Sequence, residues 1–181
     1  MKQKWEMKKP PSVYADINPN DCDLMVTMVK SKWIQKDRWI EAKRGILKNE
    51  KSLPIDNLKA MVHGTFAKIE KKMIGSRYRK KQKDERITFY GFAEGFGLGE
   101  LHHYHLLVKI PDNAKERHLN WQYVFSNHLQ LFWKKFSPPR LEENGEINPY
   151  FKVEQIRDKG AVYYCVKEAH LSPNSEHIIV K

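Results

Sequence analysis

The chain has 181 residues and a formal net charge of +11, a length that suits one domain with its own core. No apolar run could span a bilayer, the charged start lacks an apolar leader, and Cys22 and Cys165 form no C-x-x-C pair. These features argue against a membrane protein, a secreted protein and a zinc ribbon, and the basic excess indicates a polyanionic partner such as nucleic acid.

The first half of the chain predicts an arm, a strand and a helix. Residues 1–21 are basic and proline-bearing and predict an N-terminal arm. The apolar run Leu24 to Val29 has the length of a strand. From Ser52 to Ile74 the apolar residues recur at steps of three and four, which predicts a helix with one buried face. Residues 76–86 form a basic stretch that we expect to be solvated.

The second half predicts a hairpin and a second helix. Residues 87–94 and 101–110 read as two strands joined by a glycine-rich turn. An amphipathic pattern predicts a helix over 120–136, and a loop rich in Pro, Glu, Asn and Gly follows over 137–149.

A strand, a helix and a tail complete the prediction, over 150–156, 158–169 and 172–181. The order of elements predicts an α+β domain over 22–171, with a central antiparallel β-sheet flanked by helices. We expect the protein to be soluble and cytoplasmic.

The segment around His103 and His105 carries the most chemistry. Side chains at positions i and i+2 of a strand project to the same face, so these two imidazoles can share a metal ion. An isolated pair of this kind also suits ordinary structural histidines, and a third ligand would decide the matter.

Glu94 is the preferred third ligand. With a hairpin loop of residues 95–100, it pairs with Leu101 and faces the same way as the histidines. With a loop of residues 95–99 it faces away, unless a bulge intervenes. Two imidazoles and one carboxylate suit catalytic Mg²⁺ or Mn²⁺, although imidazoles also bind Zn²⁺ and Ni²⁺.

A tyrosine lies downstream on the predicted last helix. Tyr164 and Lys167 are three residues apart and share a helical face. A phenol has a pKa near 10 and needs a neighbouring cation to act as a nucleophile at neutral pH. Tyr163 stands four positions before the same lysine and remains an alternative. The structural alternative to a catalytic role is that the tyrosine is a core aromatic and Lys167 is a solvated lysine.

Together these motifs resemble the HUH endonuclease superfamily, and in particular the nuclease domain of rolling-circle replication initiators. The histidine–hydrophobe–histidine strand is matched by His103-Tyr104-His105, and an acidic residue that ends the preceding strand is matched by Glu94. A strand and then a helix with Tyr-x-x-Lys follow, matched by the segment Val153 to Lys167.

The resemblance implies a ferredoxin-like related sheet with the tyrosine helix beside it. It implies that His103, His105 and Glu94 hold Mg²⁺ or Mn²⁺, and that Tyr164, assisted by Lys167, forms a 5′-phosphotyrosine link with single-stranded DNA. The substrate would be an origin beside a hairpin in a plasmid or virus. A host helicase and polymerase would be the protein partners.

The basic and aromatic residues fit such a substrate. The N-terminal lysines, Lys71, Lys72 and the stretch 77–86 are candidates to follow phosphates. Four aromatic residues are candidates to stack on bases, although core packing is the alternative for each: Trp33, Trp39, Tyr78 and Phe96.

Three other functions remain open from the sequence. A single-tyrosine HUH transposase would use the same chemistry. A non-catalytic basic module for nucleic acid would have structural histidines. A metal hydrolase would use His103 and His105 without a tyrosine nucleophile.

Overall fold

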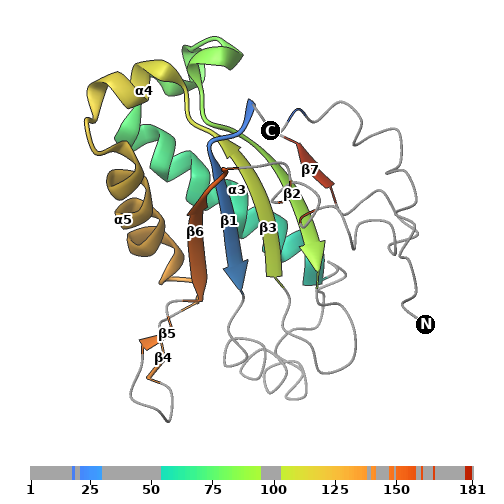
Figure 1. Cartoon of the computed structure of the whole chain (residues 1–181). Coiled ribbons are helices and arrows are strands. Elements are labelled where there is room, and N and C mark those ends of the chain that lie inside the picture. Colours follow the sequence, from blue (N-terminus) through green and yellow to red (C-terminus); the bar gives the residue numbers. More distant parts are fainter. Residues whose placement is uncertain are drawn as a thin grey trace, which may run out of the picture.

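The predicted α+β architecture is confirmed by a five-stranded antiparallel sheet (Figure 1). The computed structural model describes residues 18, 21–29, 54–94, 103–137, 140–141, 147–148, 150–157, 160, 165 and 178–180. The strand order is β6-β1-β3-β2-β7, which places β3 in the centre. The strands are β1 Leu24–Val29, β2 Thr88–Glu94, β3 His103–Lys109, β6 Phe151–Gln155 and β7 Ile178–Val180.

Two long helices cover one face of this sheet (Figure 1). They are α3, Pro54–Met73, and α5, Trp121–Trp133, and they match the two predicted amphipathic helices. A short helix α4, Asp112–Arg117, and two 3-10 turns connect the layers near one end of the sheet. The turns are η2, Tyr78–Lys80, and η3, Lys83–Glu85.

The core lies between the sheet and these helices. Alternate residues of β1 are buried on the helix side, as period-two burial requires. Phe66 of α3 joins the layers, because its ring centre is 4.4 Å from that of Phe89 in β2 and 5.9 Å from that of Phe125 in α5. The opposite face of the sheet, away from these helices, carries His103 and His105.

Tyr150 ties α5 to the sheet at the start of β6. Its φ of 54° is in the left-handed region. Its carbonyl oxygen accepts a hydrogen bond from the backbone N–H of Val29 at 2.9 Å and another from Trp133 Nε1 at 3.1 Å. One carbonyl thus fixes the end of α5 against β1.

Several predicted loops contain structure. Residues 178–180 of the predicted tail form β7, which pairs with β2 at the edge of the sheet, so the prediction of a tail is wrong for these residues. A small two-stranded sheet, β4 Arg140–Leu141 with β5 Ile147–Asn148, lies in the predicted loop 137–149. The short edge strands carry too weak a pattern to be recognised locally.

The basic stretch 76–86 is anchored rather than wholly solvated. Tyr78 is buried, and Arg86 donates from Nε and Nη2 to the two carboxylate oxygens of Glu70, at 3.2 and 3.1 Å. Glu70 is a fully buried residue of α3. The guanidinium of Arg86 also lies 5.5 Å from the ring centre of Tyr78.

Replacing Glu70 with alanine should lower the free energy of unfolding by about 2–3 kcal/mol, because it removes two charge-assisted hydrogen bonds and leaves the partly exposed Arg86 cation without its partner. Urea denaturation would measure the change. Glu154→Ala is the control, because it removes the exposed pair with Lys152 and should cost no more than about 1 kcal/mol. Equal losses in the two variants would contradict this account.

Candidate metal and nuclease site

The histidines lie on the central strand of the sheet. On β3, His103 is opposite Val29 of β1 and Glu94 of β2, and His105 is opposite Thr27. Their ring centres are 5.1 Å apart, with the ring planes nearly perpendicular. The prediction that the two imidazoles project together is confirmed, and their role as metal ligands stays a prediction.

Glu94 occupies the matching position on β2. It pairs with His103 rather than with the predicted Leu101, so the connection between the strands spans residues 95–102 instead of 95–100. A shift of two residues preserves the face, because side chains alternate with period two. The register therefore places Glu94 on the histidine face, while its side chain lies outside the described atoms.

His105 is held from the neighbouring strand. It is only 4% exposed, and its Nδ1 shares a hydrogen bond of 3.0 Å with Thr27 Oγ1. In the tautomer that metal binding requires, Nδ1 donates to this hydroxyl and Nε2 carries the lone pair. A hydrogen-bonded partner on the second nitrogen is the usual arrangement around a histidine ligand.

The donor set fits a divalent cation. Two imidazoles that bind one ion at about 2.1 Å have ring centres about 5 Å apart, which agrees with the separation of His103 and His105. Among the side chains that the structure describes, which do not include that of Glu94, no three His, Cys, Asp or Glu residues are grouped to hold a metal. A complete site therefore needs Glu94 or a residue from outside this part of the chain.

A second cluster of buried side chains covers the histidine face. It consists of Cys22, Phe92, Leu107 and Cys165. Phe92 is the partner of His105 across the sheet, and Leu107 follows His105 by two residues on the same face. Fully buried Cys165 thus packs beside the positions that flank His105.

Cys165 belongs to the segment of the predicted tyrosine helix. Gly160 and Cys165 are helical, in agreement with the helix predicted over 158–169. The predicted nucleophile Tyr164 and its partner Lys167 lie outside the described residues. Of this segment, Cys165 is the residue whose packing against the histidine face the structure describes.

The thiol of Cys22 is a packing group in this cluster. Burial raises its pKa to about 11, and the charges of Asp21 and Asp23 add to the effect. The thiol therefore stays protonated at neutral pH, which makes it a poor nucleophile there.

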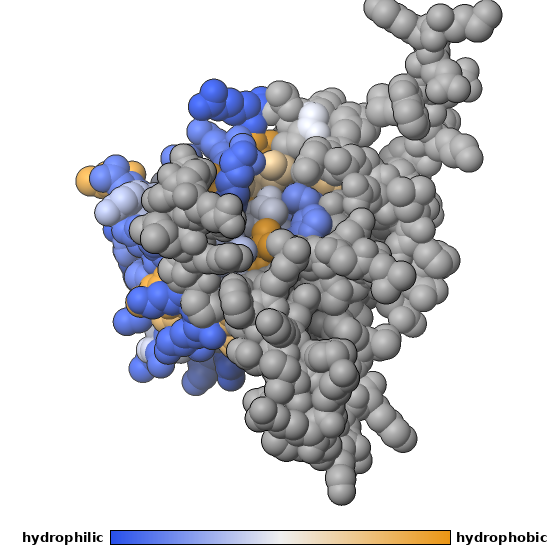
Figure 2. Space-filling view, turned by 90° about the horizontal axis from the view of Figure 1, so that it is seen from below, coloured by the Kyte–Doolittle hydropathy of each residue, from blue (hydrophilic) through white to orange (hydrophobic). Residues whose placement is uncertain are grey.

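The end of the sheet that carries His103 is the lower end in Figure 1, where β1 and β2 finish and β3 begins. Figure 2 looks onto this end. The described residues that reach the surface in that view are mostly hydrophilic, with hydrophobic ones between them.

The predicted base-stacking residues have different outcomes. Tyr78 is buried, and its hydroxyl accepts a hydrogen bond from Arg79 Nε at 3.1 Å, so its ring is not available to a base. That prediction is wrong for Tyr78. The other three, Trp33, Trp39 and Phe96, lie outside the described residues.

The sequence alone predicted no role for Thr27 or for Cys165. Thr27 is the single polar residue of the run Leu24 to Val29, and this contrast was the available signal. Its partner His105 is 78 residues away, so only the register of β1 and β3 identifies the contact.

Comparisons with protein-family models, with curated proteins and with solved structures find no match. In the described part of the chain, every helix is too short or too polar to cross a membrane.

Proposed function

We propose that this protein is a metal-dependent endonuclease of the single-tyrosine HUH type. It would nick and rejoin single-stranded DNA at a hairpin-flanked origin, and so initiate rolling-circle replication of a plasmid or virus. One observation carries the proposal: buried Cys165, from the Tyr-x-x-Lys segment, packs on the sheet face that presents His103 and His105. Cys165 reaches this face although about sixty residues separate it from His105 in the chain.

In this proposal the chain positions the scissile phosphate and supplies the nucleophile. His103, His105 and Glu94 hold Mg²⁺ or Mn²⁺, which supplies Lewis-acid polarisation of the phosphate when it is bound. Tyr164 Oη attacks phosphorus, the new Tyr–phosphate ester forms, and the bond to the 3′ oxygen breaks. The leaving oxygen takes a proton and becomes a free 3′ hydroxyl.

Lys167 lowers the cost of the phenolate form of Tyr164, because a nearby cation favours the charged phenol. The phosphotyrosine link conserves the energy of the broken phosphodiester. Attack by a 3′ hydroxyl on this link reverses the reaction, so rejoining the strand needs no ATP.

Thr27 has a positioning role in this site. Thr27→Val removes the hydroxyl that holds His105 Nδ1 and should weaken Mn²⁺ binding by about 10–100-fold, whereas Thr27→Ser retains the hydroxyl and should bind like the wild type. Calorimetric titration measures the affinity, and ¹⁵N shifts of His105 report its tautomer. Equal Mn²⁺ affinity in the Val and Ser variants would remove this role.

A non-catalytic nucleic-acid module is the second candidate. The burial of His105 and its bond to Thr27 also suit a structural histidine. One experiment distinguishes the two candidate functions. The protein is incubated with assorted single-stranded oligonucleotides and Mn²⁺. A nickase yields a protein–DNA adduct that resists SDS, and a binding module yields none.

A further inference from the structure

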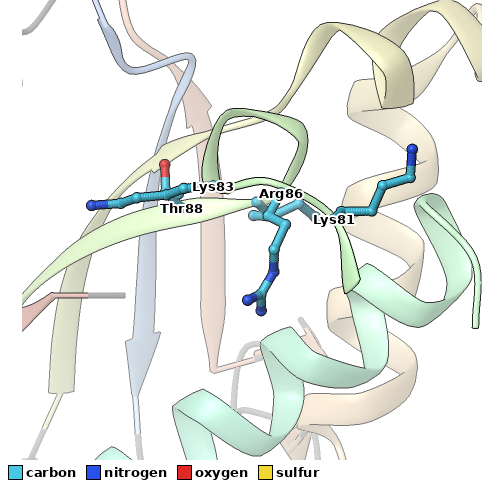
Figure 3. A pocket seen from close by; sticks show the side chains of 5 residues that line it. Lys81, Lys83, Arg86 and Thr88 are labelled. Carbon is cyan, nitrogen blue, oxygen red and sulfur yellow. The ribbon is translucent and has the colours of Figure 1, made fainter. Parts of the chain in front are cut away.

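A basic hollow lies where η3 leads into β2 (Figure 3). It has a volume of about 250 Å³, and three of its five lining residues are cationic: Lys81, Lys83, Arg86, Ile87 and Thr88. A water molecule occupies about 30 Å³ in the liquid, so the hollow has room for a phosphate group with several waters. We infer that it binds a backbone phosphate of the nucleic acid, outside the cutting site.

The cations of the hollow differ in what they already bind. Arg86 is engaged with buried Glu70, and Lys81 Nζ lies 2.6 Å from Glu85 Oε1. The side-chain ammonium of Lys83 has no hydrogen-bond or ion-pair partner among the described residues, and this side chain is exposed. Figure 3 shows Lys83 beside Thr88 on one side of the hollow and Lys81 on the other. An anion would therefore meet the charge of Lys83 and the hydroxyl of Thr88.

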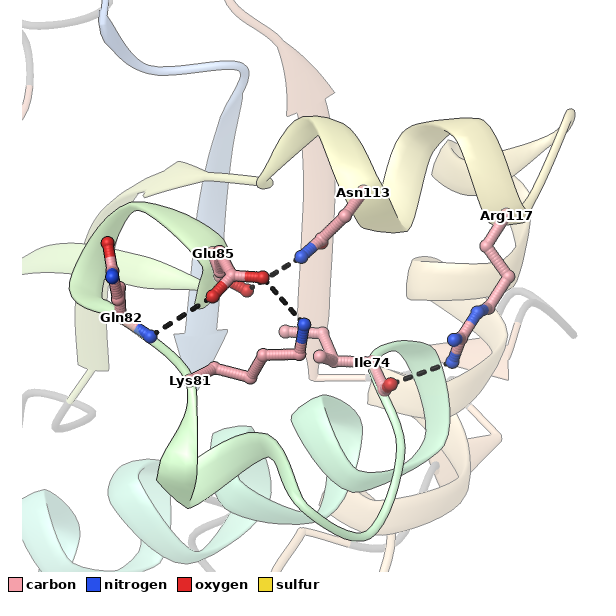
Figure 4. Close-up of polar contacts among 6 residues, drawn as sticks. All are labelled: Ile74, Lys81, Gln82, Glu85, Asn113 and Arg117. Carbon is pink, nitrogen blue, oxygen red and sulfur yellow. Dashed lines mark hydrogen bonds and ion pairs between the residues drawn. The ribbon is translucent and has the colours of Figure 1, made fainter.

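The turn that carries Lys83 is held in place before any ligand binds (Figure 4). The backbone N–H of Gln82 donates to Glu85 Oε2 at 3.3 Å, and Asn113 Nδ2 of α4 donates to the Glu85 carbonyl oxygen at 3.3 Å. The hydrogen bond from Lys81 is the main reason why the pKa of Glu85 lies below its usual value. A fixed turn reduces the ordering cost of binding.

The α4 helix that braces this turn is itself anchored. Arg117 Nη1 donates to the carbonyl oxygen of Ile74 at 2.7 Å, just after the end of α3 (Figure 4). Lys115 Nζ lies 2.7 Å from Asp23 Oδ1, at the start of β1. The hollow is thus supported by the same elements that form the core.

The lining selects for a phosphate rather than for a whole nucleotide. It includes one aliphatic side chain, Ile87, and none of the aromatic rings on which a base stacks. Further exposed cations lie in and just before η2, at Arg77, Arg79 and Lys80. Several exposed cations within one short segment match the repeating phosphates of a nucleic-acid strand better than a single small anion does.

The hollow is remote from the histidines. Thr88 and Lys109 pair at the end of β2 and β3 opposite to Glu94 and His103. Six residue steps separate the two pairs, which is about 20 Å along the strands. A phosphate in the hollow therefore belongs to DNA that flanks the scissile bond, and this contact adds affinity without touching the reaction.

The test compares Lys83→Gln with Lys134→Gln, which removes the same charge at an exposed position just after α5. Binding of a labelled single-stranded oligonucleotide is measured by fluorescence anisotropy across a salt series, in EDTA. Lys83→Gln should weaken binding several-fold at low salt and reduce the slope of log affinity against log salt by about 0.7. Lys134→Gln should leave the slope unchanged.

Equal effects of the two substitutions would overturn the inference, because the loss would then reflect net charge alone. So would a Lys83→Gln variant that loses inorganic phosphate binding and keeps DNA affinity. The inference rests on the proposed function only for the identity of its ligand, DNA. EDTA removes divalent metal, so cleavage does not disturb the binding measurement. If Lys83→Gln weakens DNA binding as predicted but the wild type forms no covalent adduct, the proposed nuclease is refuted and the phosphate hollow stands. If the adduct forms but Lys83→Gln has no specific effect on DNA binding, the nuclease stands and the hollow is refuted.

Discussion

Replacing His103 and His105 together with alanine should abolish metal-dependent cleavage of single-stranded DNA. The double variant loses both imidazoles of the proposed site, so the loss should exceed the roughly 10–100-fold effect of an outer partner such as Thr27. The fold should persist, because the larger core, between the sheet and the helices, lies on the opposite face. Cleavage of a labelled oligonucleotide over a series of Mn²⁺ concentrations measures the effect.

The matched control is His128→Ala. His128 lies on α5, where burial holds its pKa below the usual value, and it has no place in the proposed site. This variant should cut like the wild type, and circular dichroism should show that all variants are folded. Undiminished cutting by the double histidine variant would reject the metal site.

Local patterns were sufficient for the elements that build the sheet and its helical layer. The two long helices carry a periodic apolar pattern, and the strands β1, β2, β3 and β6 lie in apolar or alternating runs of adequate length. The six-residue α4 follows Pro111 and shows no such stripe, so the sequence predicted no helix there. The three residues of β7 are too few for a pattern and depend on the edge of β2 for pairing.

The polar contacts could not be predicted, because they join residues far apart in the chain. Glu70 follows Phe66 by four residues, so helical periodicity alone puts it on the buried side of α3. Its partner Arg86, however, comes from beyond the helix. The bond between Thr27 and His105 likewise needs the register of two strands. Sequence spacing brought His103 and His105 together because both lie on one strand, where alternation is a local property.

The proposed nucleophile is the central claim for the site, and it is tested by one substitution. Tyr164→Phe removes only a hydroxyl, so DNA binding and folding should be retained while the covalent intermediate disappears. Tyr163→Phe is the matched control, because it changes the adjacent residue in the same way and should keep full adduct formation.

The decisive measurement maps the adduct by mass spectrometry, after the wild-type protein and both tyrosine variants are incubated with single-stranded oligonucleotides and Mn²⁺. We predict an SDS-resistant adduct on Tyr164 in the wild type and in Tyr163→Phe, and none in Tyr164→Phe. An adduct that survives in Tyr164→Phe, or that maps to Tyr163 in the wild type, would contradict the assignment.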